Sequence, residues 1–228
     1  MTSLSLDLDL EGKSLRGKVH FQGIIPWPIH PFSPGIMGPF AFIPFMECYH
    51  GVLSLDHSIG GTLHWGEQAI DFHRGRGYIE TDYGQAFPRA WVWMQSNHFS
   101  IPGTSLTLSV ARIPWLGMAF RGFIIGLWHE GQLHRFTTYL GSRLRTLSVT
   151  DQEVRLVVES RQEGLRVRAI RSGGGLLHAP YRIEMERRVT ESLTAQVEVE
   201  LFRKKNGKEH LLFQGRGRNA GLEVNGDL

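Results

Sequence analysis

The chain has 228 residues, and its 25 basic and 22 acidic side chains give a formal net charge of +3. Its 27 glycines and 10 prolines favour many turns over long helices. A single cysteine, Cys48, excludes an internal disulfide and fits a reducing compartment. The N-terminus has neither the basic start nor the apolar core of a signal peptide. We therefore expect a cytoplasmic protein, with peripheral contact to a membrane left open.

Apolar residues at every second position predict β-strands along most of the chain. The runs with this pattern begin with Leu4, Leu6, Leu8 and Leu10, and recur around 154–158, 165–169 and 195–201. Turn signals separate the runs at Glu11-Gly12, Gly60-Gly61, Trp65-Gly66-Glu67, Glu130-Gly131, Glu163-Gly164 and Asn206-Gly207. About sixteen short strands at this spacing predict an all-β antiparallel protein of the sandwich or barrel type.

The segment from Val19 to Met46 has no Asp, Glu, Lys or Arg but contains six prolines. Each proline removes a backbone donor that lipid cannot replace, so the segment does not predict a membrane-spanning helix. It predicts an extended crossover with two interpretations. It is either a connector packed over the end of a barrel or a lid through which a prenyl chain enters from lipid.

The run from Gly77 to Phe99 concentrates acids, indoles, amides and a histidine in a strand pattern. Buried polar groups need partners, so such a density favours a pocket for a largely apolar ligand with a few polar contacts. On the first strand, one face carries Tyr78, Glu80 and Asp82. On the next, one face carries Trp91, Trp93, Gln95 and Asn97, and His98 lies on the other. In an earlier strand, Glu47 and Tyr49 share a face.

Other chemistries lack support in the sequence. The histidines show no metal-ligand spacing, and His129-Glu130 is followed by a histidine one residue too late for the zinc-helix pattern. No phosphate loop, dinucleotide fingerprint or serine nucleophile elbow is convincing. In the basic second half, arginines alternate with apolar residues as solvated strand faces do, so we expect no nucleic-acid partner. We expect no metal and no cofactor.

The central motif, together with residues 34–38, 45–51 and the tail 220–228, resembles the tocopherol cyclase family. The resemblance implies a tandem of lipocalin-like barrels. Residues 1–99 would then form a partial first barrel with the Pro-rich crossover at 19–46, and residues 100–228 a second barrel. Open strand edges invite pairing. The first region therefore pairs in a homodimer, folds over the second as one sandwich, or takes its remaining strands from a partner.

The resemblance also implies a reaction. A proton is added to a prenyl double bond, and the phenol oxygen attacks the resulting cation to close a chromanol ring. This chemistry needs a dry carboxylic acid, electron-rich rings and a base. We expect Asp82 to be the proton donor, with Glu80 or Glu47 as alternatives. The competing interpretation makes Asp82 a turn carboxylate bonded to backbone amides.

The remaining motif residues would contact the substrate. Trp91 and Trp93 would stabilise the cation, or else only pack in a core. His98 is either a base or a buried structural group. The predicted binding residues are Tyr49, Tyr83, Trp91, Trp93, Gln95 and Asn97. The predicted function is a cyclase-like isomerase for a prenylated quinol. The alternatives are a non-catalytic prenyl-lipid carrier and a hydratase of isoprenoid double bonds, each with a small hydrophobic ligand and open to contact with a membrane or lipid droplet.

Overall fold

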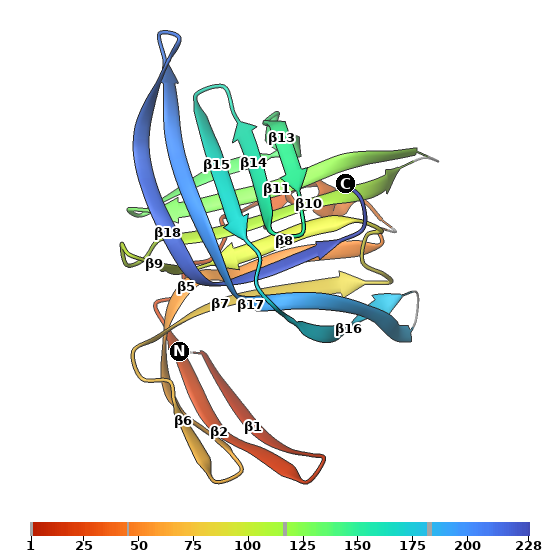
Figure 1. Cartoon of the computed structure of the whole chain (residues 1–228), viewed down its shortest axis with the longest axis vertical. Coiled ribbons are helices and arrows are strands. Elements are labelled where there is room, and N and C mark those ends of the chain that lie inside the picture. Colours follow the sequence, from red (N-terminus) through yellow and green to blue (C-terminus); the bar gives the residue numbers. More distant parts are fainter. Residues whose placement is uncertain (1, 45, 116–117, 182–183) are drawn as a thin grey trace. The chain divides into compact units, whose positions relative to one another are not determined.

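The computed structural model describes residues 2–44, 46–115, 118–181 and 184–228, and Figure 1 traces their order. In these ranges the regular structure is almost entirely β-strand, and the helical segments are two short 3-10 turns, η1 (Gly38–Phe42) and η2 (Thr138–Leu140). The pairs β1–β2, β10–β11 and β17–β18 are all antiparallel. The prediction of an all-β antiparallel protein is therefore confirmed.

The strands form two large sheets and one small hairpin. The smaller sheet has the order β1-β2-β5-β6, with β7 paired to β5. Its strands are β1 (Thr2–Leu10), β2 (Lys13–Gln22), β5 (Cys48–Trp65), β6 (Gln68–Asp71) and β7 (Gly75–Gly84). The larger sheet has the order β12-β11-β10-β8-β18-β17-β15-β14-β13, with β16 on β17 and β9 on β18. The short strands β3 (Ile29–His30) and β4 (Ser33–Pro34) pair with each other.

The larger sheet comprises eleven strands. Their bounds are β8 (Trp91–Ser96), β9 (His98–Phe99), β10 (Ser105–Trp115), β11 (Met118–His129), β12 (Gln132–Thr137), β13 (Arg143–Val149), β14 (Glu153–Glu159), β15 (Glu163–Ile170), β16 (Gly175–Tyr181), β17 (Glu184–Lys205) and β18 (Lys208–Asn225). Long antiparallel hairpins thus dominate the C-terminal half.

Several of the turns predicted from the sequence are present in the structure. In Glu11-Gly12, Glu130-Gly131 and Asn206-Gly207 both residues have positive φ, which is the backbone of a two-residue type I′ hairpin turn. The prediction of a turn at Gly60-Gly61 is wrong, because both residues lie within β5. At Gly61 the backbone of β2 approaches so closely that a Cβ would lie 2.3 Å from the Lys18 carbonyl oxygen. That glycine therefore serves strand packing, which sequence pattern alone does not separate from a turn.

The chain divides into two compact units, residues 1–27 with 52–81 and residues 28–51 with 82–228. The predicted ranges 1–99 and 100–228 do not coincide with these two units. Strands β8 and β9, which lie before residue 100, belong to the larger sheet. Their sheet partners β10 and β18 are strands of the second unit.

The second unit has one continuous hydrophobic core. Side chains from strands at both ends of the sheet order, such as Phe136 on β12 and Leu156 on β14, belong to the same buried cluster. The sheet therefore curls around its own interior, and Figure 1 shows β13, β14 and β15 crossing β8, β10 and β11. The predicted alternating runs supply this core. Their members, from Val154 to Leu201, are between 0% and 3% exposed.

The first unit buries a polar cluster on β5. The Asp56 carboxylate forms an ion pair with Arg76, and Asp56 is fully buried. The Ser54 hydroxyl donates to the Asp56 carbonyl oxygen and lies 2.9 Å from Nδ1 of His57. Because the single proton of this hydroxyl is used in the hydrogen bond to Asp56, the Nδ1–H group of His57 is the donor in the second hydrogen bond. Burial lowers the pKa of His57, which is 2% exposed.

The Pro-rich segment both packs and exposes aromatic groups. Ile36 is buried, and its carbonyl oxygen accepts a 2.9 Å hydrogen bond from the Tyr139 hydroxyl of η2. Gly38 lies against the same ring, since a Cβ there would be 2.6 Å from Tyr139 atoms. Phe32 and Phe42, in contrast, are 86% and 60% exposed. The segment is thus a connector anchored to the second unit that also presents apolar side chains outward.

Candidate functional site

Strand β8 separates core residues from the predicted site residues. Val92, Met94 and Ser96 are fully buried, and the two apolar ones belong to the interior core. Trp91 and Trp93 alternate with them and belong instead to a second apolar cluster on the opposite face of the sheet. The predicted alternation of faces is therefore correct from Trp91 to Ser96, and the indoles lie on the outer face of the curled sheet.

The indoles meet two acids through strand pairing. On β18, Glu223 lies directly opposite Trp93. On β17, Glu191 lies directly opposite Glu223. Residues opposite each other in an antiparallel pair point to the same face, with Cβ atoms about 4.5–5.5 Å apart. We call Trp93, Glu223 and Glu191 the acid–indole row.

Glu223 is held by the neighbouring indole. Nε1 of Trp91 donates a 2.7 Å hydrogen bond to Oε2 of Glu223. An indole N–H only donates, so this carboxyl oxygen is the acceptor, and a donated hydrogen bond favours the charged form of the carboxyl group. Trp91 is itself 5% exposed, so the hydrogen bond is shielded from water at its indole end. Charge-assisted hydrogen bonds of this kind are about twice as strong as neutral ones.

Apolar side chains surround the row. The cluster around Trp91 contains Ala111, Ala179 and Val189, with Phe87, Trp93 and Ile113 packed against it. The ring of Phe87 meets Trp91 edge to face, with centroids 5.6 Å apart. Gly221 leaves the space that the Trp93 ring occupies, because a Cβ there would lie 2.8 Å from two ring carbons. The environment is thus aromatic and poor in water.

Burial acts on one acid of the row in particular. It raises the pKa of the Glu191 carboxyl, since taking a carboxylate out of water disfavours its charged form. Val189, two residues earlier on the same face of β17, is 3% exposed and belongs to the apolar cluster. Across β16, the residue opposite Glu191 is Gly175, which adds no charge. Burial therefore shifts the Glu191 carboxyl towards its protonated form.

Two polar atoms on the same face have unused hydrogen-bonding capacity. Oε1 of Gln95 and Oγ of Ser105 are buried and have no hydrogen-bond partner. Gln95 lies opposite Thr107 on β10, and Ser105 is two residues from Thr107, so both side chains share the outer face. Buried polar groups without partners are uncommon, and a ligand hydroxyl or a water supplies what they lack.

The predicted donor, Asp82, lies in a different setting. Its Oδ1 is 2.8 Å from Nδ1 of His50, and the Cys48 thiol donates to the same oxygen at 3.8 Å. The Asp82 side chain is 28% exposed and that of His50 is 13% exposed. Beside it on β7, Tyr83 stacks on Tyr49 with ring centroids 5.0 Å apart. This acid–imidazole pair can pass a proton, and the donor role of Asp82 stays a prediction.

The two alternative proton donors, Glu80 and Glu47, have different surroundings. Glu80 accepts a 2.6 Å hydrogen bond from the Tyr78 hydroxyl on the same strand. Oε2 of Glu47 is buried without a hydrogen-bond partner. The strand that carries Glu80 and Asp82 pairs with β5, whereas β8 pairs with β10 and β18, so the two predicted site strands are not neighbours in a sheet.

The remaining predicted polar residues flank β8. Asn97 is 7% exposed. His98 follows on β9, opposite Arg218 of β18, and its Nδ1 lies 3.1 Å from the amide nitrogen of Asn219. The next residue, Phe99, belongs to the interior core, so His98 points away from that core, as Trp91 and Trp93 do. The predicted placement of His98 on the opposite face is therefore wrong, because the strand is interrupted at Asn97 between β8 and β9. Its alternative role as a structural hydrogen-bonding group also stays a prediction.

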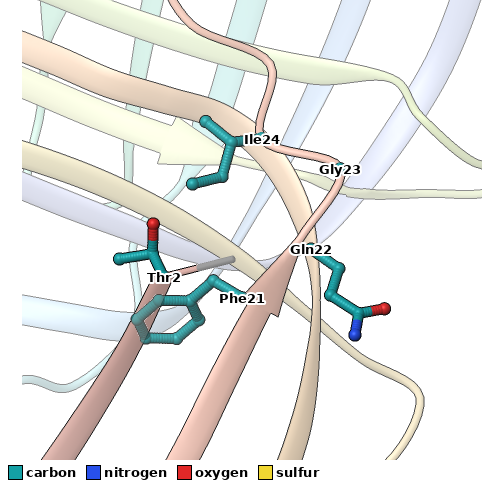
Figure 2. A pocket seen from close by; sticks show the side chains of 5 residues that line it. All are labelled: Thr2, Phe21, Gln22, Gly23 and Ile24. Carbon is teal, nitrogen blue, oxygen red and sulfur yellow. The ribbon is translucent and has the colours of Figure 1, made fainter.

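Figure 2 shows a pocket of a different kind, in the first unit. Its volume is about 360 Å³, and it is lined by Thr2, Phe21, Gln22, Gly23 and Ile24. None of these side chains titrates near neutral pH. This pocket can therefore accept an apolar group but cannot supply a proton.

Sequence reasoning missed both acids of the row. Glu223 lies in the tail motif 220–228, and that signal would have been sufficient to single it out. Glu191 carries no such signal, because only the pairing of β17 with β18 brings it beside Glu223. The structure thus joins the predicted tryptophans to two acids that the sequence did not assign.

Comparison with known families matches residues 9–226 to the tocopherol cyclase-like family. A probable chloroplastic tocopherol cyclase of Oryza sativa subsp. japonica is 23% identical over 205 residues, which cover 83% of this chain and 42% of that protein. The chloroplastic tocopherol cyclase of Zea mays is 28% identical over 109 residues, covering 46% of this chain and 23% of that protein. The chain thus spans less than half the length of either relative.

Among solved structures, that of CghA superposes with a TM-score of 0.52 at 12% sequence identity, covering 98% of this chain and 64% of that chain. This likeness concerns the fold alone. The fold is all-β, antiparallel and lipocalin-like, as predicted. In the described ranges, no helix has the length and hydropathy needed to cross a bilayer.

Proposed function

Because this chain belongs to the tocopherol cyclase-like family, we propose that it is an isomerase that closes a chromanol ring on a prenylated quinol. In this reaction a proton adds to the prenyl double bond nearest the aromatic head. The phenol oxygen then attacks the tertiary cation. Substrate and product have the same composition, so the protein has to supply an acid, a base and a surface that stabilises positive charge.

One observation carries the proposal, the hydrogen bond between Trp91 and Glu223 within an aromatic cluster. Indole faces attract cations by about 0.5–2 kcal/mol, and more strongly where water is excluded. A carboxylate 2.7 Å from an indole nitrogen therefore sits beside the surface that would hold the cation. A carboxylate is the type of group that can accept the phenol proton.

The predicted binding residues give the quinol head its contacts. Gln95 lies on the indole face of β8, and its Oε1 lacks a partner; Asn97 directly follows the strand and is 7% exposed. A phenol hydroxyl is a donor of the kind that this oxygen accepts. Tyr49 and Tyr83 stack with each other beside the Asp82–His50 pair, which is the proton-donating group predicted from sequence.

The reaction is tested by incubating the purified chain with dimethylphytylbenzoquinol in D₂O. We expect chromanol carrying one deuterium on the carbon next to the new carbon–oxygen bond, because the solvent-exchanged acid delivers that atom. Heat-denatured protein serves as the control for uncatalysed closure. Recovery of unchanged quinol after measured binding would identify a carrier and refute the proposal. An open-chain tertiary alcohol would identify a hydratase instead.

A further inference from the structure

We propose that Glu191 is the acid that protonates the double bond and that Glu223 is the base that accepts the phenol proton. This inference rests on the proposed function and assigns its two proton-transfer steps. Both residues lie in the second unit, on strands β17 and β18, and they face each other directly across the strand pair. Neither belongs to the stretch around Asp82 from which the sequence predicts the donor.

The first argument is position. Glu223 is opposite Trp93 on one side and opposite Glu191 on the other, so the three side chains follow one line across the sheet. Cβ atoms of directly opposite residues are about 4.5–5.5 Å apart, which is within reach of two glutamate side chains. A double bond held over Glu223, in the middle of the row, therefore has Trp93 on one side and Glu191 on the other.

The second argument is the division of roles. The Glu223 oxygen that faces Trp91 Nε1 accepts a hydrogen bond, and a bond of this kind favours the charged form of a carboxyl group. Glu191 differs, because burial raises the pKa of its carboxyl and so favours the protonated form. An active site that needs an acid and a base often uses two carboxyl groups whose surroundings separate their pKa values. The row has this asymmetry.

The third argument is the surroundings. Val189 on β17 and Ala179 on β16 bring the apolar cluster to the Glu191 end of the row, and both are at most 3% exposed. Asp82, in comparison, has a 28% exposed side chain and an imidazole nitrogen 2.8 Å away. Alkene protonation needs an acid shielded from water, and Glu191, which is itself half-buried beside this apolar cluster, offers one.

The proton transfers balance within the row. The Glu191 O–H bond breaks as a C–H bond forms at the less substituted alkene carbon. The phenol oxygen then forms the C–O bond to the tertiary carbon, and its proton passes to Glu223. Transfer of that proton from Glu223 to Glu191 restores the starting state. No electron is gained or lost, and nothing besides the quinol is consumed.

Isosteric variants test the assignment. We expect Glu191→Gln to lower kcat at least about 100-fold, the lower range of general acid catalysis, while the quinol still binds. Glu191→Asp keeps an acid and should recover part of the rate. Glu223→Gln should also lower kcat, whereas the exposed control Glu67→Gln should stay close to wild type. Glu67 is exposed and lies in the turn between β5 and β6.

A spectroscopic measurement checks the acid without turnover. At neutral pH the infrared C=O band of a protonated carboxyl group should be present in the wild type and in Glu67→Gln but absent in Glu191→Gln. Wild-type turnover that persists in Glu191→Gln would overturn the inference while leaving the proposed function intact. A wild type that makes no chromanol would overturn the proposed function and the catalytic assignment with it. The infrared band would then still show whether Glu191 holds its proton.

Discussion

The substitution Gly221→Ala tests how much the site depends on the position of Trp93. Gly221 lies opposite Gln95, and a Cβ there would be 2.8 Å from Cη2 and Cζ3 of the indole. The ring would have to withdraw by roughly 0.7–1.2 Å to reach the usual carbon–carbon separation of about 3.5–4.0 Å. Overpacking of this kind costs about 1–3 kcal/mol of unfolding free energy. Because Trp93 heads the acid–indole row, chromanol formation should fall as well.

The matched control is Gly173→Ala, whose new Cβ meets nothing within 4 Å. A glycine-to-alanine change without strain usually stabilises by about 0.4–1 kcal/mol, because it restricts the unfolded chain. Urea unfolding and near-ultraviolet circular dichroism should therefore separate the two variants. The dichroism reports the tryptophan environment directly. If Gly221→Ala unfolds at the same urea concentration as Gly173→Ala with an unchanged tryptophan signal, the reasoning about this contact is refuted.

Three further predictions concern other parts of the chain. A double-mutant cycle of Trp91→Phe and Glu223→Gln, measured by urea unfolding, should give a coupling of about 1.5–3 kcal/mol, and a coupling near zero would contradict the hydrogen bond. Burial lowers the pKa of His57, so below about pH 6.5 the unfolded chain takes up a proton that the folded chain resists. As the pH falls below that value, the free energy of unfolding should decrease by up to about 1.4 kcal/mol per pH unit. The decrease should be smaller in His57→Gln, and an equal pH dependence in the two proteins would contradict this role of His57. Phe32→Ser should reduce co-sedimentation with phosphatidylcholine vesicles at unchanged stability, because Phe32 is 86% exposed; unchanged co-sedimentation would exclude lipid contact there.

The strands could be predicted because their signal is local. Val154, Leu156 and Val158 alternate with polar residues, and all three are fully buried in the core of the second unit. The same holds for the two-residue turns, where glycine and its neighbour adopt positive φ. A two-residue period and a turn of this kind need no information from distant parts of the chain. For this reason the fold class follows from the sequence.

The site depended on information that is not local. The predicted partners of Trp93 were the acids of residues 80–82, which are near in sequence, but the acid opposite Trp93 on the sheet is Glu223, with Glu191 one strand further. Strand pairing between residues about a hundred positions apart depends on register, and register is set by the whole sheet. The periodicity of β8 gave the correct face but carried no information on what lies opposite it.

The location of the row also follows from how the second unit fills its interior. Barrels of about eight strands are just wide enough for their own side chains, and here Val92, Leu108 and Ile125 fill the interior at 0% exposure. Such aliphatic positions offer no proton donor, so acid chemistry needs the opposite face of the same strands. Along β18, alternation of side chains provides an aliphatic core residue and an acid on the outer face, with Leu222 in the core and Glu223 in the acid–indole row. Because successive side chains point to opposite faces, the acids can change without opening the core, and a loss of activity in Glu191→Gln can be separated from a loss of stability.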